Sequence, residues 1–407
     1  MTIQRAHEEI LKLILAAEGG AEQIEAAIRE VGPERTAHIL ADELVNRADL
    51  HEIPGQDTAP VDIQLALAFD GATVGHVIRA GKSAEHEAGR AEQPHATIEA
   101  DLAELLRAVL GPWRAPEAQV LRIVWHDLED TERLGGTMHV FPVVKRLVRG
   151  TTGRHEDLGE LSLRQGSDKW GLHFYTPHYD RHFGPLRDRP LKILELGIGG
   201  YGNPASGGGS LRMWKRFFPR AVIYGVDVFD KAPLREQRIH TVEGDLSDEG
   251  FLRSLGRDLG PFDIVIDDAS HGNDDLIAAF KSLFPYVRPG GLFAAEDLQT
   301  SYWPGYGGSS RELSSPGTSM GFLKTLLDGL NHEEREHPEG HEPSQTDLTL
   351  TGAHFYPSLA VFEKGVNAEG ASASWIPRQK MSYEEMSAVD WGEGLTADHA
   401  DEDGPGQ

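Results

Sequence analysis

The residue types best suited to chemistry stand in two short acidic segments, IDDASHGND and AAED. If these segments end neighbouring strands, Asp267 or Asp268 meets Glu296 and Asp297, and such carboxylates repel one another unless a cation lies among them. All-oxygen ligands favour Mg²⁺ or Ca²⁺ over zinc. His271 would then lie in the loop over the cation as the natural general base. Alternatively, each acid caps the following helix and His271 is an ordinary loop histidine.

A glycine-rich segment at 191–209, LKILELGIGGYGNPASGGG, has the pattern of a cofactor loop. Its apolar start predicts a buried strand, its glycines a tight turn, and the residues from Ser210 a helix. Only glycine lets a backbone turn so sharply and lie against a ligand without a Cβ in the way. By spacing, Gly197, Gly199 and Gly202 form G-x-G-x-x-G, which alone leaves nicotinamide, flavin and S-adenosylmethionine open.

Three acidic residues near this loop separate those cofactors. Glu195 stands two residues before Gly197, where it can orient the loop or face a cationic ligand. Asp227 closes the next strand, where a carboxylate can accept both ribose hydroxyls, although it lies farther along the chain than in a nicotinamide fingerprint. Asp245 ends the third strand and suits an adenine amino group. Each alone is equally well a surface carboxylate, but together they fit a positively charged sulfonium better than a pyrophosphate.

A third segment at 164–180, RQGSDKWGLHFYTPHYD, is rich in groups that hold polar ligands. Ser167 and Asp168 are able to cap a helix, which is an ordinary structural role. Four ring-bearing residues follow, just before the cofactor strand: His173, Tyr175, His178 and Tyr179. A lid over the cofactor is an equally good interpretation of these residues.

The composition limits the possible functions. With 407 residues and 39% hydrophobic content, the chain can bury a large core and has the length of two domains. No apolar run is long enough to cross a bilayer, and the N-terminus lacks the features of a signal peptide. The absence of cysteine excludes disulfides and thiolate metal sites and fits a cytoplasmic protein. The net charge of −26 repels phosphate backbones and anionic lipids, so we expect neither nucleic acid nor a membrane as a partner.

The elements that position the acidic residues alternate regularly between 161 and 396. Strands are expected at 221–228, 239–245, 263–268 and 292–297, with helices at 248–259 and 275–286. This alternation predicts an α/β fold with a doubly wound, mostly parallel sheet, whose ligand site lies at the carboxyl ends of the strands. Residues 347–365 predict two further strands that form an antiparallel edge. The acidic residues 397–407 predict a disordered tail.

The chain before this domain predicts a small α+β unit at 1–112 and a linker at 113–160. Amphipathic helices are expected within 1–50, a hairpin around Asp70-Gly71, and another amphipathic segment from Ile98 to Leu110. The linker is expected to carry helices at 118–127 and 138–148. The pattern of the N-terminal helices is equally consistent with an oligomer interface and with ordinary packing in the core.

Four runs of sequence resemble one enzyme family: LELGIGGYGNPASGGGSLRMW, GSDK, IDDASH and AEDLQTSYWPGYGG. They are similar to the deoxysugar O-methyltransferases of macrolide and aromatic-polyketide antibiotic pathways, most strongly from about 161 to 308. The resemblance implies a Rossmann-like class I methyltransferase domain behind an auxiliary domain, with S-adenosyl-L-methionine and Mg²⁺ as cofactors. It also implies a homotetramer in which the auxiliary domain helps to complete a neighbour's active site.

The resemblance implies roles for single residues as well. Asp268, Glu296 and Asp297 would hold Mg²⁺, and His271 would be the catalytic base. The residues expected to contact the cofactor are Ser167, Glu195, Gly197, Ile198, Gly199, Gly200, Tyr201, Ser210, Asp227, Asp245, Leu246 and Asp268.

We therefore expect methyl transfer to a deoxysugar hydroxyl of a glycosylated polyketide, with the 2'-OH of a rhamnose-like sugar as the favoured position. Tyr302, Trp303 and Tyr306 would stack on the sugar or pack within their own loop. The alternatives are an NAD(P)-dependent oxidoreductase and a non-catalytic assembly subunit. The histidine-rich loop at 332–341 matches no role in the family.

Overall fold

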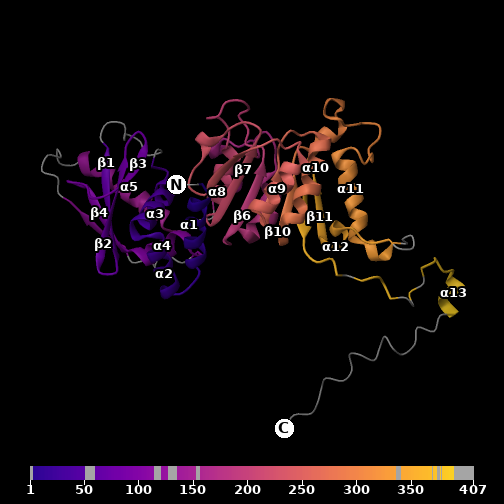
Figure 1. The fold of residues 1–407 in the computed structure, drawn as a ribbon, viewed down its shortest axis with the longest axis horizontal. Helices are drawn as coiled ribbons and strands as arrows, with labels where there is room; N and C mark the ends of the chain where they lie inside the picture. Colours follow the sequence, from indigo (N-terminus) through magenta and orange to yellow (C-terminus); the bar gives the residue numbers. More distant parts are fainter. Residues whose placement is uncertain are drawn as a thin grey trace, which may run out of the picture.

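Two layered α/β units lie side by side in the computed structural model of the chain (Figure 1). The structure describes residues 3–50, 60–113, 121–126, 135–152, 156–335, 341–368, 370–373, 376 and 378–388. The tail predicted at 397–407 lies outside these described residues. Within the described ranges, no helix has both the length and the apolar character needed to cross a membrane.

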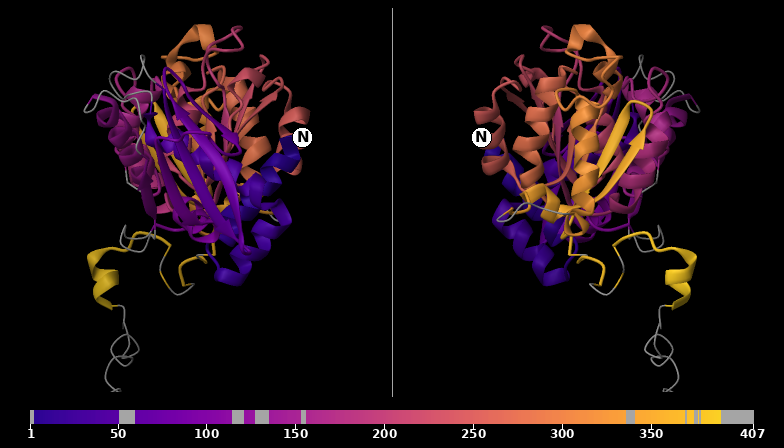
Figure 2. Two further views of the ribbon diagram at one scale, coloured as in Figure 1. Left: turned by 90° about the vertical axis from the view of Figure 1, so that its left-hand side faces the viewer. Right: turned by 90° about the vertical axis from the view of Figure 1, so that its right-hand side faces the viewer.

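The N-terminal unit is a helical layer against a mixed five-stranded sheet, seen from the sheet side in Figure 2 (left). Its strand order is β3-β2-β1-β4-β5, and only the β1–β4 pair is parallel. The helices are α1 (Ile3–Ala16), α2 (Ala21–Val31), α3 (Pro33–Ala48), α4 (Leu102–Leu110) and α5 (Gly135–Gly150). The strands are β1 (Val61–Phe69), β2 (Ala72–Ala80), β3 (Ala84–Ala88), β4 (Ala96–Asp101) and β5 (Arg122–Trp125).

The predicted hairpin is confirmed, because β1 and β2 pair in antiparallel register around Asp70 and Gly71. Both turn residues have a positive φ, 48° and 76°, as the favoured two-residue hairpin turn requires. The predicted amphipathic segment from Ile98 starts instead as β4 and becomes helical only after Asp101. The Asp101 side chain accepts bonds from the amides of Ala103 and Glu104 and so caps α4.

The polar segment after Gly81 contains β3, which pairs with β2. One further expectation for this unit was wrong. The helix predicted at 118–127 is absent from the described residues 121–126, where β5 pairs with β4 instead. Cross-strand pairing is a tertiary effect that overrides local helical pattern. The N-terminal sheet thus includes residues beyond 112, although the division of the chain into domains stays a prediction.

The second unit is built on a seven-stranded sheet in the order β11-β12-β10-β9-β6-β7-β8. The strands are β6 (Leu191–Leu196), β7 (Ala221–Asp227), β8 (Ile239–Glu243), β9 (Phe262–Asp267), β10 (Val287–Ala295), β11 (Leu350–Tyr356) and β12 (Leu359–Lys364). The helices are α6 (Leu158–Gln165), α7 (Thr176–Phe183), α8 (Gly209–Phe217), α9 (Glu249–Leu259), α10 (Asn273–Leu283), α11 (Ser319–Leu330), α12 (Gln345–Thr349) and α13 (Tyr383–Ala388).

The predicted doubly wound α/β fold is confirmed. The central strands from β10 to β8 pair in parallel, whereas β12 and β11 add an antiparallel edge. These central strands are almost wholly buried, which explains why their sequences are apolar runs rather than alternating patterns.

Buried charged side chains join the two units. Arg238 donates to both carboxylate oxygens of Glu43 on α3, at 2.7 and 2.9 Å, and both side chains are at most 1% exposed. Arg220 donates to the Leu110 carbonyl at the end of α4 (3.0 Å) and pairs with Glu18 at 2.7 Å. Because a buried charge is stable only with its partner, these contacts hold the helical layer of the first unit against the second.

Candidate active site

The predicted site residues gather at the carboxyl ends of β6 to β10. The strand order reverses here, because the chain passes from β6 outward to β7 and β8, and later to β9 and β10 on the other side. In open parallel sheets this reversal leaves a crevice in which ligands bind. The glycine loop follows β6, Asp227 ends β7, Asp268 follows β9 and Glu296 follows β10.

The glycine loop needs its glycines for two physical reasons. Gly197 has a φ of +89°, and a Cβ there would lie 2.1 Å from the Asp268 carbonyl oxygen, so the loop packs directly on the end of β9. Gly199 also has a positive φ, +73°, but faces open space. Asp227 accepts the Ile198 amide at 3.0 Å and thereby fixes the loop to β7. The loop thus combines bare backbone with a neighbouring carboxylate, and its contact with a cofactor stays a prediction.

Glu195 is wholly buried at the end of β6 and is left without ordinary hydrogen bonds. Neither carboxylate oxygen has a hydrogen-bond partner among the described residues, although the Lys169 ammonium lies 3.4 Å away. Burial raises the pKa of Glu195 to about 7 against the opposing effect of Lys169. Since an unsatisfied buried carboxylate is costly, this position suits a ligand that brings positive charge, such as a sulfonium cofactor.

A buried lysine that sequence reasoning missed lies among the carboxylates. Lys169 is unexposed, and its Nζ is 2.7 Å from Glu296 and 2.9 Å from Asp268. Burial lowers the pKa of Lys169, but Asp268, Glu296 and Glu195 more than offset this, so the pKa lies well above its ordinary value. Lys169 therefore remains an ammonium that neutralises part of the acidic cluster. Only its place in the GSDK run marked it in the sequence.

Glu296, which the resemblance implies as a metal ligand, is paired with two protein donors in this structure. Its Oε1 accepts from both Lys169 and the Tyr179 hydroxyl, the latter at 2.5 Å. Burial and Asp268 raise the pKa of Glu296 well above its ordinary value, against the effect of Lys169. Burial likewise raises the pKa of Asp268 against the same lysine. The expected three-carboxylate ligand set stays a prediction, and in this structure Glu296 serves as the partner of Lys169.

Asp297 and His271 form the other half of the cluster. His271 Nδ1 lies 3.1 Å from Asp297 Oδ2, and the Tyr175 hydroxyl and Gln299 amide donate to Oδ1, each at 2.9 Å. Burial raises the pKa of Asp297, but Gln299, His271 and His173 together bring it below its ordinary value. His271 and Asp297 both have left-handed backbones, with φ of 59° and 51°. Such strain in non-glycine residues is typical of functional sites.

Asp268, His271 and Asp297 each offer one ligand atom, and these atoms lie within 4.8 Å of one another. The surrounding acids outnumber the single lysine, so a cation here would offset excess negative charge. The carboxylate oxygens are the donors that Mg²⁺ prefers. The residues present therefore fit a magnesium ion held by Asp268 and Asp297. The neighbouring acid Asp267 is buried apart from this group, with one oxygen unpartnered.

The segment before the cofactor strand contributes to the acidic cluster through three of the four residues predicted as a lid. Tyr175 and Tyr179 donate to Asp297 and Glu296, and His173 stacks on Tyr175 with its Nε2 3.6 Å from Asp297. His178 instead stacks on Tyr356, with ring centroids 3.9 Å apart. The lid stays a prediction.

The remaining predicted contacts lie at the same edge of the sheet. Ser167 follows the end of α6, so the alternative that it caps a helix start is wrong. Ser210 stands in the first turn of α8. Asp245 is exposed after β8, where it accepts bonds from the amide and hydroxyl of Ser247, and Leu246 is half-buried. Their contact with the cofactor stays a prediction.

Comparison with known proteins identifies relatives over nearly the whole chain. A family described as "MycE methyltransferase N-terminal" matches residues 10–121. The chain is 44% identical to the 8-demethyl-8-alpha-L-rhamnosyl tetracenomycin-C 2'-O-methyltransferase of Streptomyces olivaceus, over 88% of this chain and 94% of the relative. The chain is also 42% identical to the 8-demethyl-8-(2-methoxy-alpha-L-rhamnosyl)-tetracenomycin-C 3'-O-methyltransferase of the same organism, over 90% of this chain and 95% of the relative.

Solved structures agree with these relatives. The MycE methyltransferase from the mycinamycin biosynthetic pathway, in complex with Mg and SAH, superposes with a TM-score of 0.85 at 37% identity. The match covers 94% of this chain and 99% of that one. A further complex of MycE also contains mycinamycin VI and matches with a TM-score of 0.83.

Proposed function

This chain belongs to the sugar O-methyltransferases of macrolide and tetracenomycin pathways, and from that membership we propose that it methylates the 2'-OH of a rhamnose-like sugar on a glycosylated polyketide. Its cofactors are S-adenosylmethionine and Mg²⁺. The sugar position is the finer part of the proposal, and the 44% identity to a rhamnosyl 2'-O-methyltransferase supports it. No observation favours an NAD(P)-dependent oxidoreductase or a non-catalytic assembly subunit.

The observation that carries the mechanism is the His271–Asp297 pair. His271 Nδ1 lies 3.1 Å from Asp297 Oδ2, and an Nδ1–H directed at this carboxylate would leave the lone pair on Nε2. The His271 side chain is 33% exposed, so Nε2 can reach a substrate hydroxyl. We assign His271 as the general base that takes the hydroxyl proton while the sugar oxygen attacks the methyl carbon and the carbon–sulfur bond breaks.

The other residues bind and orient the reactants. The bare backbone at Gly197 and Gly199, together with Asp227, holds the methyl donor, and the buried Glu195 faces its positive charge. When bound, Mg²⁺ makes a sugar hydroxyl easier to ionise and fixes its oxygen, and Asp268 and Asp297 are placed to hold it. Fixing both reactants in line supplies much of the rate.

Replacing His271 by alanine tests the proposed base. We expect His271→Ala to lower the rate of methyl transfer by about 10²- to 10⁴-fold, because a positioned base contributes this much. Binding of S-adenosylmethionine, measured by calorimetry, should stay unchanged. The matched control is His354→Ala, since His354 lies on β11 at the antiparallel edge of the sheet, where it pairs with Glu363. Full activity in His271→Ala would contradict the assignment of the base.

The substrate is tested separately with labelled S-adenosylmethionine and a panel of rhamnosylated polyketides. We expect label in the sugar, and an NMR map of the product should place the methyl group on the 2'-oxygen. Methylation at another sugar position would contradict the position while leaving the reaction class intact. Labelling of the aglycone alone would contradict the proposed function.

We also propose that the protein assembles as a homotetramer through its N-terminal unit. One face of the five-stranded sheet supports this, because it carries a groove lined by small residues such as Ala66 and Ala68 and by charged ones such as Glu99 and Arg122. The N-terminal helices are less suited to this role, since Ile14, Ile28 and other apolar residues are buried within the chain itself. Analytical ultracentrifugation of the full chain tests the state, and a monomer at micromolar concentration would contradict it.

A further inference from the structure

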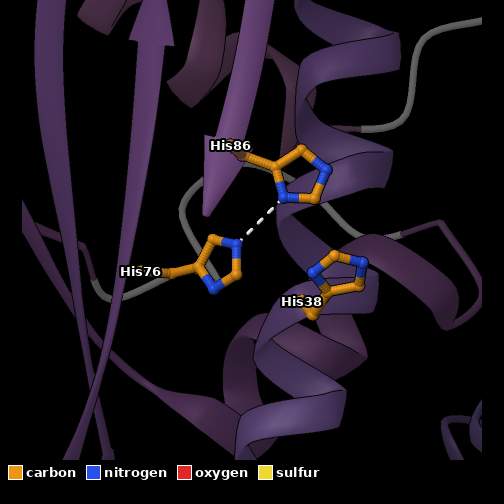
Figure 3. Close-up of side chains that lie close together, drawn as sticks. All are labelled: His38, His76 and His86. Carbon is orange, nitrogen blue, oxygen red and sulfur yellow. Dashed lines mark hydrogen bonds between the residues drawn. The ribbon is translucent and has the colours of Figure 1, made fainter. Parts of the chain in front are cut away.

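Three histidines from different elements of the N-terminal unit face one another far from the predicted methyl-transfer residues (Figure 3). His38 comes from α3, His76 from β2 and His86 from β3. Each offers one ring nitrogen, and these nitrogens lie within 4.8 Å of one another. The closest contact is between His76 Nε2 and His86 Nδ1, at 2.9 Å. The sequence analysis did not single out this cluster, because its members are 10 to 48 positions apart in the chain.

The cluster is incompletely satisfied by hydrogen bonds. His76 is wholly buried, and its Nδ1 has no hydrogen-bond partner among the described residues. Burial lowers the pKa of His76 to about 4 and also lowers the pKa of His38, so both rings are neutral at pH 7. A neutral imidazole carries a lone pair on one ring nitrogen, which is the form that binds a metal ion. Ordinary packing does not require buried imidazoles to converge in this way.

Asp42 is positioned to orient the His86 ring for metal binding. It lies one helical turn after His38 on α3, and its Oδ1 is 3.4 Å from His86 Nε2. When Nε2–H donates to this carboxylate, the lone pair of His86 is on Nδ1, the nitrogen that faces His76 (Figure 3). A carboxylate behind a histidine is the usual way in which proteins orient a metal-binding imidazole.

We propose that His38, His76 and His86 bind one Zn²⁺ ion, with Asp42 as the residue that orients His86. Imidazole nitrogens favour zinc, whereas the oxygen-rich cluster at the methyl-transfer site favours Mg²⁺. Tetrahedral zinc with nitrogen ligands needs nitrogens about 3.3 Å apart, so His76 and His86 would separate by a few tenths of an ångström. A groove lined by His38, Asp42 and Arg35 borders the cluster on the α3 side, and water would supply the fourth ligand.

The proposed ion would tie an edge strand to the helix that contacts the second unit. Among the described residues β3 lies at the edge of the sheet and pairs with β2, so His86 stands on an edge strand, whereas His76 stands on β2, which also pairs with β1. The third stands on α3, which also carries Glu43, the partner of Arg238. We therefore infer a structural role, in which zinc holds β2 and β3 against α3.

The test measures zinc binding by the full chain with saturating Mg²⁺ present, so that the oxygen-rich site is occupied. After chelation and dialysis, Zn²⁺ is titrated against a competing chelator, and Co²⁺ is added in parallel to record the visible band of a tetrahedral nitrogen site. We expect one Zn²⁺ per chain in the unaltered protein. His86→Gln should weaken binding at least a hundredfold, and Asp42→Asn about 10- to 100-fold. The matched control is His126→Ala, an exposed histidine of the same unit.

His86 and Asp42 are chosen because their side chains are 12% and 35% exposed, whereas the wholly buried His76 is needed for packing. Circular dichroism and S-adenosylmethionine binding check that each variant is folded. If His86→Gln fails to fold, Asp42→Asn decides the question. No zinc binding at micromolar concentration, or equal affinity in the protein and in a folded variant, would overturn the proposal and leave the cluster as hydrogen-bonded packing.

Discussion

Replacing Lys169 by methionine should destabilise the second unit by about 3–5 kcal/mol, the cost typical of removing one partner from a buried ion pair. Coulomb's law with an effective dielectric constant of about 20 gives roughly 6 kcal/mol for each of the two contacts shorter than 3 Å, those to Glu296 and Asp268. The net loss is smaller, because the stranded carboxyl groups take up protons and each pKa unit is worth only about 1.4 kcal/mol.

The sign of the pH dependence follows from the raised pKa of Lys169. Its contribution to stability is fully present below the ordinary lysine pKa of about 10.4 and is lost only as the pH rises through the higher folded value. In Lys169→Met the remaining carboxyl groups are protonated more completely at low pH. The deficit against the unaltered protein should therefore be larger at pH 8 than at pH 6.

Urea unfolding, monitored by tryptophan fluorescence, measures the loss of stability in Lys169→Met. The buried Trp214 reports on the site because it packs edge-on against Tyr179, which donates a hydrogen bond to Glu296. The matched control is Lys380→Met, because Lys380 is exposed and should change stability by less than about 0.5 kcal/mol. If the two variants have equal unfolding midpoints, or if the deficit of Lys169→Met does not change with pH, the view of Lys169 as the counter-charge of the acidic cluster is refuted.

Three further predictions concern the cofactor site. S-adenosylmethionine affinity should rise between pH 6 and pH 8 as Glu195, with a pKa of about 7, loses its proton, and calorimetry should find this dependence absent in Glu195→Gln. Gly197→Ala should abolish cofactor binding, because the new Cβ would lie 2.1 Å from the Asp268 carbonyl oxygen. Gly199→Ala places its Cβ within 4 Å of no atom, so it should lower the free energy of unfolding by only about 1–2 kcal/mol for its positive φ. Equal losses of stability in thermal unfolding would argue against this difference. Removing Mg²⁺ with EDTA should abolish methyl transfer and added Mg²⁺ should restore it, whereas full activity in EDTA would mean that the carboxylates are structural.

The part of the site that follows from local sequence was predictable. Glycines that stop an apolar run, and acids that end the next strands, are signals within a few residues, and they placed Gly197, Asp227 and Asp268 at one edge of the sheet. Lys169 was not predictable in this way, because its partner Asp268 is 99 positions away and its burial is a tertiary fact. The pairing of Glu296 with Lys169 was missed for the same reason.

The N-terminal unit shows a similar division. The Asp70-Gly71 turn carries its own backbone requirement, so the hairpin could be derived from two residues. By contrast, β3 and β5 are short, and their own sequences lack a strong period-2 pattern, although each pairs with the strand that precedes it. A short element held mainly by its partner strand cannot be recognised from its own residues.

The ion pair between Glu43 and Arg238 bears on how this chain can change over generations. A recombination event that exchanged only the first unit with that of a relative would bring Arg238 a new neighbour, and a non-acidic residue at position 43 would strand a buried guanidinium. Such an exchange should therefore leave a stable chain only where the donated unit supplies an acidic residue at this position.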